Sequence, residues 1–156
     1  MSFDKIRDPR KLRHQIGDME CDYIYTAGIA GERFYIALRD EGKLLATHCK
    51  KCNHTFMPPR MYCDLCFGEL TEYKQVPPRG IIESYTITYD SRDGEPLAEP
   101  LVLAFIKIDE TDGGLIHTVS QIQPHSLKIG TKVEAVFEDK AKRKGALTDI
   151  RYFKPI

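Results

Sequence analysis

The sequence carries no net charge and no long apolar run. Its 23 lysines and arginines are matched by 23 aspartates and glutamates, so no general attraction to nucleic acid or to an anionic membrane is expected. The longest apolar runs, such as residues 101–106, fall far short of the roughly 20 residues that span a bilayer, and residues 1–15 are charged rather than apolar. We therefore expect a cytoplasmic protein with no membrane partner.

The sequence also lacks the usual local motifs of catalysis, since it contains no Gly-rich phosphate loop, no nucleophile elbow and no HExxH. Glu83, Asp109, His117 and Asp149 lie on or beside predicted strands and alternate with apolar neighbours, as solvent-facing strand residues do. His117 is the best single candidate for acid–base chemistry. We expect no catalytic residue and no enzyme activity of the chain alone.

The cysteines do not form the even set that a secreted disulfide framework would show. Four of the five stand in two CxxC pairs, and the fifth, Cys21, stands alone. Two such pairs in a cytosolic chain are more typical of metal binding than of disulfides or of a redox dithiol. We interpret Cys21 as a small buried hydrophobe.

The two CxxC pairs predict one structural zinc site made by Cys49, Cys52, Cys63 and Cys66. Two intervening residues allow a tight turn that places both sulfurs of a pair on one side, and two facing turns form a tetrahedral cage of four thiolates. A closed cage leaves no position for water, which indicates a structural role. A rubredoxin-type iron centre uses the same ligands, and His48 and His54 stand close enough in sequence to compete.

The chain divides into three parts at the level of sequence pattern. We assign residues 1–43 to an N-terminal arm and helix, 44–77 to the zinc ribbon and 78–156 to a β-barrel. A short helix is predicted near residues 9–16 and an amphipathic helix over 32–41, where Phe34, Ala37 and Leu38 recur at helical spacing before Gly42. Residues 43–48 form a short strand ahead of Cys49.

After the cysteines the pattern becomes β throughout. Five strands are predicted, separated by turn signals, over residues 80–89, 101–108, 115–122, 132–137 and 147–153. A helical turn over 123–129 lies between the third and fourth strands. Five strands with a helical element after the third are the layout of an OB-fold barrel, so the fold class is mainly β.

With these parts in order, the chain resembles the acyl-CoA-associated proteins that join a rubredoxin-like zinc ribbon to an OB-fold. The resemblance covers residues 32–156. It rests on seven short stretches: Leu38-Arg-Asp-Glu-Gly42, Cys49-Lys-Lys-Cys52, Phe56-Met-Pro-Pro-Arg60, Tyr62-Cys63-Asp-Leu-Cys66, Gly80-Ile-Ile-Glu-Ser-Tyr-Thr86, Leu127-Lys-Ile-Gly130 and Lys132-Val-Glu-Ala-Val-Phe137.

The resemblance implies a non-catalytic accessory subunit of a hetero-oligomer. Proteins of this kind accompany thiolase-fold enzymes, including an arylsuccinyl-CoA thiolase or the archaeal acetoacetyl-CoA thiolase and hydroxymethylglutaryl-CoA synthase, and support assembly and CoA or acyl-CoA binding. In this chain Phe56, Arg60 and Arg79 are candidates for CoA contact, because CoA offers phosphates to arginine and an adenine to an apolar face. Prolines 58 and 59 belong to the same candidate face.

Two other function classes stay open at this point. OB barrels and zinc ribbons both occur in nucleic-acid-binding proteins, but these need basic patches interleaved with aromatics. The basic cluster of residues 140–144 contains no aromatic residue. A stand-alone hydrolase or hydratase using His117 is the other class. The subunit hypothesis predicts exposed apolar side chains on the arm and helix, at Tyr23, Tyr25, Phe34 and Tyr35.

Overall fold

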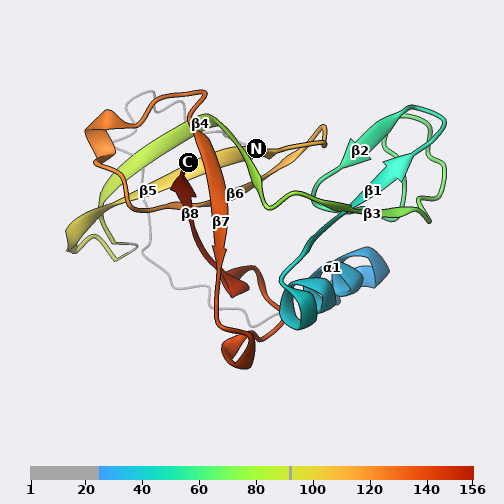
Figure 1. The fold of residues 1–156 in the computed structure, drawn as a ribbon, viewed down its shortest axis with the longest axis horizontal. Helices are drawn as coiled ribbons and strands as arrows, with labels where there is room; N and C mark the ends of the chain where they lie inside the picture. The colour runs from blue at the N-terminus through green and yellow to red at the C-terminus, as the bar shows by residue number, and fades with distance from the viewer. Residues whose placement is uncertain (1–24, 92) are drawn as a thin grey trace, which may run out of the picture.

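A barrel and a small three-stranded sheet lie side by side, with one helix packed next to them (Figure 1). The computed structural model describes residues 25–91 and 93–156. The short helix predicted near residues 9–16, and the predictions for Cys21 and Tyr23, lie outside the described residues. In the described part of the chain, no helix is long and apolar enough to cross a membrane.

The helix α1 (Gly28–Glu41) begins four residues before the predicted start. Its first turn contains two glycines, which weaken the sequence signal for a helix. The Thr26 hydroxyl accepts a hydrogen bond from the Gly28 amide at 3.1 Å. The helix ends at Gly42, whose φ of 65° is in the left-handed region and whose amide bonds to the Leu38 carbonyl, as a glycine C-cap does.

The buried face of α1 corrects one prediction. Phe34, expected on an exposed apolar surface, is only 3% exposed and packs into the main core. Tyr35 is half-buried against the same core. The exposed apolar residues here are Tyr25, Ile29 and Ile36. The helical periodicity therefore identified the core-facing stripe of the helix, and the aromatic residue in that stripe belongs to the interior.

The ribbon is a small antiparallel sheet with strand order β2-β1-β3. Its strands are β1 (Leu44–Cys49), β2 (His54–Phe56) and β3 (Tyr73–Val76). The third strand was not predicted, because it is four residues long and only Val76 is buried. It pairs with β1, with Leu44 opposite Val76, and this pairing positions the end of β3 next to the start of the barrel.

The barrel closes in the strand order β4-β5-β6-β8-β7. All neighbouring pairs are antiparallel except β6 and β8, and a 3-10 helix, η2 (Pro124–Ser126), follows the third strand. This five-stranded Greek-key barrel confirms the predicted OB-fold. The strands are β4 (Arg79–Asp90), β5 (Pro96–Ile108), β6 (Gly114–Val119), β7 (Lys132–Phe137) and β8 (Ile150–Pro155).

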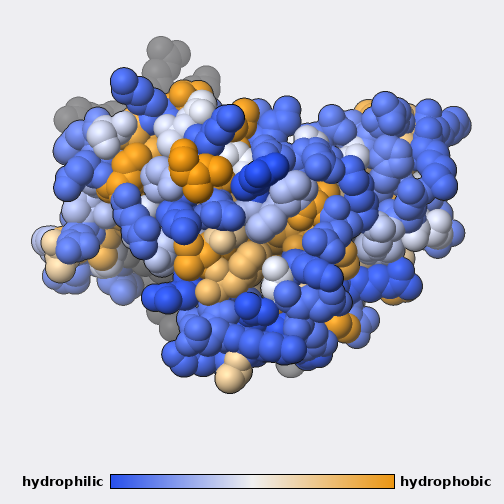
Figure 2. Space-filling view, viewed as in Figure 1, coloured by the Kyte–Doolittle hydropathy of each residue, from blue (hydrophilic) through white to orange (hydrophobic). Residues whose placement is uncertain are grey.

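One apolar core joins the barrel, the helix and the base of the ribbon. Leu38 from α1, Val76 from β3 and Phe153 from β8 belong to the same buried cluster. The ribbon tip has its own smaller cluster around the cysteines. On the face seen in Figure 2, hydrophobic residues gather over the barrel, whereas the surface of the ribbon is mostly hydrophilic. The metal site is thus carried by a ribbon that is anchored in the barrel core.

Asp149 corrects a second prediction. It was expected to face solvent, but it is 2% exposed at the end of the 3-10 helix η4 (Leu147–Asp149). Its carboxylate accepts hydrogen bonds from the amides of Lys144 and Gly145 at 2.8 Å and of Ala146 at 3.3 Å. These bonds hold the preceding loop, including the 3-10 helix η3 (Lys140–Lys142), against the barrel. Asp149 is a structural residue.

Candidate metal centre

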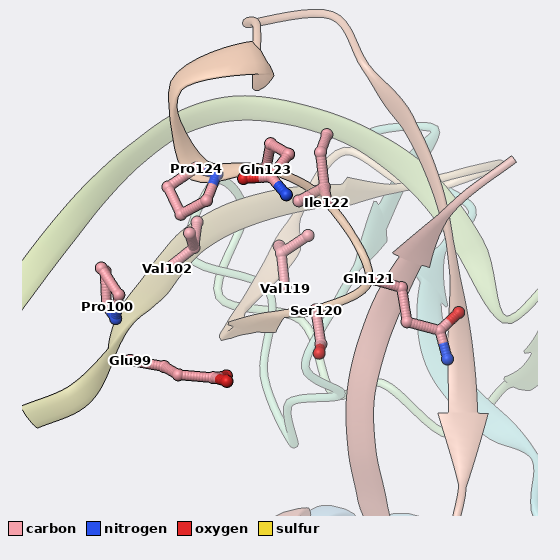
Figure 3. A pocket seen from close by; sticks show the side chains of 9 residues that line it. All are labelled: Glu99, Pro100, Val102, Val119, Ser120, Gln121, Ile122, Gln123 and Pro124. Atoms are coloured by element: carbon pink, nitrogen blue, oxygen red, sulfur yellow. The ribbon is translucent and has the colours of Figure 1, made fainter.

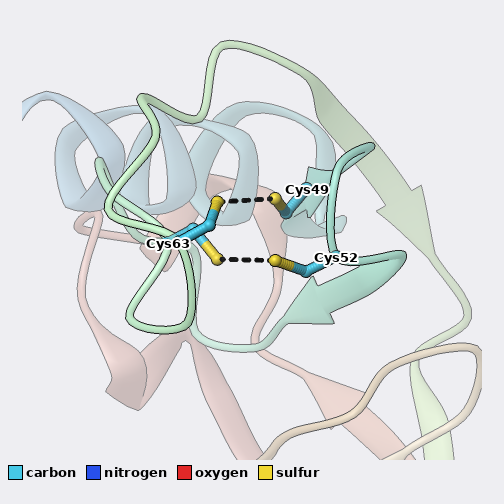
Figure 4. A group of neighbouring side chains, drawn as sticks. Cys49, Cys52 and Cys63 are labelled. Carbon is cyan, nitrogen blue, oxygen red and sulfur yellow. Dashed lines mark hydrogen bonds between the residues drawn. The ribbon is translucent and has the colours of Figure 1, made fainter.

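Two loops bring the four predicted cysteines together. Cys49 ends β1 and Cys52 lies in the turn before β2, while Cys63 and Cys66 stand in a second turn between β2 and β3. The sulfur atoms of Cys52 and Cys63 are 3.8 Å apart (Figure 4). Those of Cys49 and Cys66 are 3.7 Å apart. All four lie within 4.8 Å of one another.

The spacing of these sulfurs fits a tetrahedral metal ion. With metal–sulfur bonds of 2.3 Å, a regular tetrahedron has edges of about 3.8 Å, close to the two short distances. Cys49 and Cys63 are buried, and Cys52 and Cys66 are half-buried. Four soft thiolates form a closed set that suits zinc and leaves no coordination position for a substrate. The arrangement is that of a structural site.

The backbone around each CxxC pair has the shape of a tight turn. The residues after the second cysteine of each pair, Asn53 and Phe67, have φ angles of 51° and 58°. In the second turn, the Phe67 amide donates to the Cys63 carbonyl at 2.8 Å and the Cys63 amide donates to the Gly68 carbonyl at 2.9 Å. A left-handed conformation is uncommon for a bulky residue, so these bonds hold Phe67 in place.

The thiols of Cys52 and Cys66 differ in acidity before a metal binds. The Gly68 amide donates to the sulfur of Cys66 and, with the neighbouring thiols, lowers the pKa of Cys66 to about 7. Hydrogen bonding with Cys66, together with burial, raises the pKa of Cys52 to about 12. Four thiolates cannot share this small volume unless a cation balances their charge. The electrostatics of the site therefore favour a bound divalent ion.

The two nearby histidines are used elsewhere. His48 Nδ1 lies 3.0 Å from the Thr55 hydroxyl. His54 Nδ1 lies 3.6 Å from the Asp112 carboxylate, and its ring packs at 4.5 Å on Phe56. Among the residues that the structure describes, the one cluster of metal-ligating side chains consists of the four cysteines. Neither histidine competes for the metal in this arrangement.

The ribbon and the barrel meet at a loop that sequence reasoning did not single out as functional. The Asp112 amide donates to the Thr55 carbonyl at 2.9 Å, and the Thr55 amide donates to the Asp112 carboxylate at 2.8 Å. At Gly113 an added Cβ would lie 2.3 Å from the Met57 carbonyl oxygen, so only glycine allows this approach. The sequence Asp112-Gly-Gly114 indicates a turn, but it does not indicate that this turn packs against the ribbon at Thr55 and Met57.

The three residues predicted to contact CoA do not form one exposed face. Phe56 is 4% exposed and packs in the ribbon core. The Arg60 guanidinium lies 5.1 Å from the Phe56 ring centroid and pairs with Asp64 at 2.6 Å. Arg79 pairs instead with Asp109 at 3.2 Å. Arg60 and Phe56 are brought together, with the arginine outermost, and Pro59 is buried while Pro58 is exposed.

His117 is half-buried rather than solvent-facing. Its Nδ1 accepts the Thr118 amide at 2.9 Å, and its ring meets Phe153 edge-on at 5.7 Å. It borders a shallow cavity of about 360 Å³ beside Leu147 and Arg151. In the described part of the chain, no carboxylate is hydrogen-bonded to His117. The ring is therefore held by backbone and core contacts rather than by a catalytic partner.

The basic cluster of residues 140–144 is partly neutralised by its own loop. Lys142 pairs with Asp139 at 3.3 Å and approaches Glu138 at 4.0 Å. Arg143 Nε donates to the Glu138 carbonyl at 2.8 Å, and its guanidinium lies 5.7 Å from the Phe137 ring. These contacts make the cluster a structural part of the loop rather than a free basic stripe.

Comparisons with known proteins agree with this geometry. Residues 37–72 match a family model of the rubredoxin-like zinc ribbon domain of ChsH2, and residues 73–138 match a model of the C-terminal OB-fold domain of ChsH2. A DUF35 domain-containing scaffold protein of Pyrococcus furiosus is 25% identical over 104 residues, which covers 67% of this chain and 75% of that relative.

Two solved structures share the fold. A DUF35 family protein of unknown function from Sulfolobus solfataricus matches with a TM-score of 0.65 and 27% identity, over 83% of this chain and 87% of the other. A chain of the Ltp2-ChsH2(DUF35) aldolase matches with a TM-score of 0.58 and 18% identity, over 80% of this chain and 93% of that one. The two family models together cover residues 37–138 and show that the chain belongs to the family in which a ChsH2-type rubredoxin-like zinc ribbon is followed by a ChsH2-type OB-fold domain.

Proposed function

We propose that this chain is a non-catalytic accessory subunit that docks on a thiolase-fold acyl-CoA enzyme and supports assembly and CoA binding. The observation that carries the proposal is the pairing of a closed four-thiolate site with an OB barrel, joined where the base of the ribbon packs into the barrel core. The described residues of this chain hold a structural metal site and show no further cluster of catalytic groups. These features suit a protein that stabilises a binding surface for a partner rather than one that catalyses a reaction.

The relatives support an assembly role. The relative from Pyrococcus furiosus is described as a scaffold protein. The structural neighbour of similar fold is part of an aldolase described jointly as Ltp2 and ChsH2. We extend to this chain the general idea of an enzyme partner. An arylsuccinyl-CoA thiolase, or an acetoacetyl-CoA thiolase with hydroxymethylglutaryl-CoA synthase, is our proposal for the type of partner.

We also propose that Arg60 contributes to CoA binding in the assembled complex. Its guanidinium is exposed at the ribbon tip and is oriented by the Phe56 ring and by Asp64. An arginine already held in one orientation loses little entropy when it binds a phosphate. Phe56, being buried, acts by supporting Arg60. Arg79 is exposed beside Asp109 and is the second candidate phosphate contact.

The proposal is tested by affinity purification of the tagged chain from its native cells, with mass-spectrometric identification of what is bound. We expect a thiolase-fold enzyme that acts on an acyl-CoA. Recovery of nucleic-acid machinery instead, or of no partner at low salt, would contradict the proposal. Isothermal titration of CoA into the purified complex then tests Arg60. Arg60→Ala should weaken binding about tenfold, while Arg60→Lys should keep part of the affinity.

The nucleic-acid alternative finds no support in the described surface. The basic cluster of residues 140–144 is engaged within its own loop, through Lys142 and Arg143, and no aromatic residue is interleaved with it. Single-stranded binding by OB barrels relies on exposed aromatics beside a cationic groove. A gel shift that weakens with salt at micromolar protein would revive the alternative.

A further inference from the structure

Strands β4 and β5 continue beyond the barrel as a two-stranded arm. β7 pairs with β4 only over residues 79–81, and β6 pairs with β5 only over 102–107. Residues 84–87 of β4 pair with residues 102–105 of β5. Farther out, residues 88–101 pair only with each other and close at a turn in which the Ser91 amide bonds to the Glu95 carbonyl. We call residues 84–101 the β4–β5 arm, which extends to the lower left of Figure 1.

The arm is poorly covered for a β-hairpin. A two-stranded hairpin standing alone is marginally stable in water, because it has no second layer on which to bury its apolar face. On β4, Tyr85, Ile87 and Tyr89 alternate with Ser84, Thr86 and Thr88, so one face is apolar and the other is polar. Tyr85 bonds through its hydroxyl to the Leu127 carbonyl at 3.0 Å, but Tyr89 is 50% exposed.

The two edges of the arm differ. The outer edge of β5 contains Pro96 and Pro100, and a proline has no amide to donate to a further strand. The outer half of β4 contains no proline. Beyond Ile82, its backbone pairs only with β5 among the residues that the structure describes. Strand addition is therefore blocked on the β5 side and open on the β4 side.

The arm is also the acidic part of a neutral chain. Residues 84–101 contain four acidic residues and one basic residue, Arg92, whereas the whole chain has no net charge. The side chains of Asp90, Asp93, Glu95 and Glu99 are exposed, and none has an ion-pair partner within the described ranges 25–91 and 93–156. Unpaired charge gathered on one projecting element attracts a surface of opposite charge.

A hollow of about 550 Å³ lies at the base of the arm. Figure 3 shows Glu99 and Pro100 along β5 on one side of it, and the segment from Val119 to Pro124 on the other. Val102, Val119 and Ile122 contribute an apolar part of its lining, Ser120, Gln121 and Gln123 contribute a polar part, and Glu99 adds a carboxylate. This composition suits an apolar side chain that is followed by a cationic one.

We propose that the β4–β5 arm is the element that docks on the enzyme subunit, and that a basic, extended segment of that enzyme lies along the free edge of β4. This inference rests on the proposed function and names the surface it would use. The partner segment supplies Lys or Arg to the acidic rim and an apolar side chain to the hollow at the arm base. Main-chain pairing along β4 supplies the rest of the contact. A second copy of this chain is disfavoured, because two acidic arms repel each other.

Charge reversal tests the arm in the complex of the full-length protein with its identified enzyme. Asp93→Lys/Glu95→Lys reverses two charges at the arm tip. Glu32→Lys/Glu69→Lys makes the same change in net charge at exposed sites away from the arm, on α1 and in the ribbon. We expect the arm variant to raise the Kd at least about tenfold at low salt, and the control less than about twofold. A full equivalent of zinc and a wild-type urea unfolding midpoint in each variant show that the ribbon and the barrel have both folded.

The outcomes separate the two proposals. If the wild-type chain does not bind the enzyme, the proposed function fails and the arm inference fails with it. If the wild type binds and both variants bind as tightly, only the arm inference is overturned. Equal weakening by both variants also overturns it, since net charge rather than the arm would then control binding.

Hydrogen exchange identifies the occupant of the β4 edge. Within residues 84–90, the amides that point away from β5 should exchange rapidly in the free chain and become protected when the enzyme is added. The chain's own residues 5–13 hold five basic residues and one acidic residue and are a rival occupant. Protection that is already present in the free chain and lost on deletion of residues 2–24 would overturn the inference in favour of that segment.

Discussion

The ribbon and the barrel obtain their order from different sources. The buried cluster at the ribbon tip contains Phe56, Leu70 and the cysteines, so the metal replaces a core that a unit of this size cannot build. The barrel closes around Ile82, Ile106 and Phe153, which are almost fully buried, and depends on apolar burial. The ribbon should therefore unfold when the metal is removed but tolerate changes to its apolar residues. The barrel should tolerate metal removal but lose stability when its apolar core is truncated.

Metal removal should have the largest effect and should affect the ribbon alone. Structural zinc contributes about 10–16 kcal/mol of apparent binding free energy in small zinc domains. A strong chelator, or Cys63→Ser, should therefore collapse the amide resonances of residues 47–72 while those of β5 and β6 keep their dispersion. Two-dimensional NMR with and without chelator measures this. Simultaneous loss of barrel resonances would contradict the division of roles.

Truncation of the barrel core should have the next largest effect. Phe153 is fully buried and packs against His117, so Phe153→Ala should lower the free energy of unfolding by about 3–5 kcal/mol through lost burial and a cavity. Urea unfolding followed by circular dichroism measures the loss, and zinc content in the absence of urea should stay at one equivalent. Ile156→Ala, at a residue 63% exposed, is the control and should change little.

Protonation of Asp149 makes the stability of the barrel depend on pH. Burial alone raises the pKa of this carboxyl, but hydrogen bonds from three backbone amides outweigh that effect, so the pKa of Asp149 is lowered overall. A lowered folded pKa stabilises the protein above the unfolded value of about 3.9, and the contribution is lost as the pH falls below it. Asp149→Asn should cost about 1–3 kcal/mol at pH 7.

The difference in unfolding free energy between wild type and Asp149→Asn should shrink as the pH falls below about 3.9, because the unfolded wild type then binds a proton that the folded carboxyl binds only at lower pH. A carboxyl carbon NMR titration measures the same group directly. A midpoint for Asp149 above that of a free aspartate would show that burial outweighs the amides, contrary to the geometry.

The contact between ribbon and barrel should show the smallest effect. Asp112→Ala removes the carboxylate that accepts the Thr55 amide and should cost about 1 kcal/mol, as one hydrogen bond does. Faster exchange of the Thr55 amide, with unchanged zinc content, is the expected signature. Glu95→Ala, on the exposed arm, is a matched acidic control without such a contact. An equal effect of both substitutions would mean that the loop does not link the two parts.

Much of the fold could be predicted from the sequence, because local signals mark it. The CxxC spacing identified the metal ligands, and period-two alternation with turn residues identified the five barrel strands in order. Strand ends were less accurate. β5 begins at Pro96 rather than at residue 101, because the arm is exposed and lacks an apolar run. The strand β3 is too short and polar for a sequence signal.

The rest depends on tertiary contacts that leave no local trace. Phe34 and Asp149 were both expected at the surface, and both are buried, because packing across elements decides which side of a residue meets solvent. Phe56 was grouped with Arg60 as a binding face, and the structure keeps them adjacent but buries the ring. The adjacency followed from the sequence, whereas the depth of each side chain did not.

Native mass spectrometry of the complex purified from cells tests the central claim most directly, because one spectrum gives both metal content and partner. We predict a species whose mass equals this chain with one zinc ion plus an acyl-CoA enzyme of thiolase fold. A spectrum that shows only the free chain, or a chain that holds iron or no metal while bound to its partner, would contradict the account.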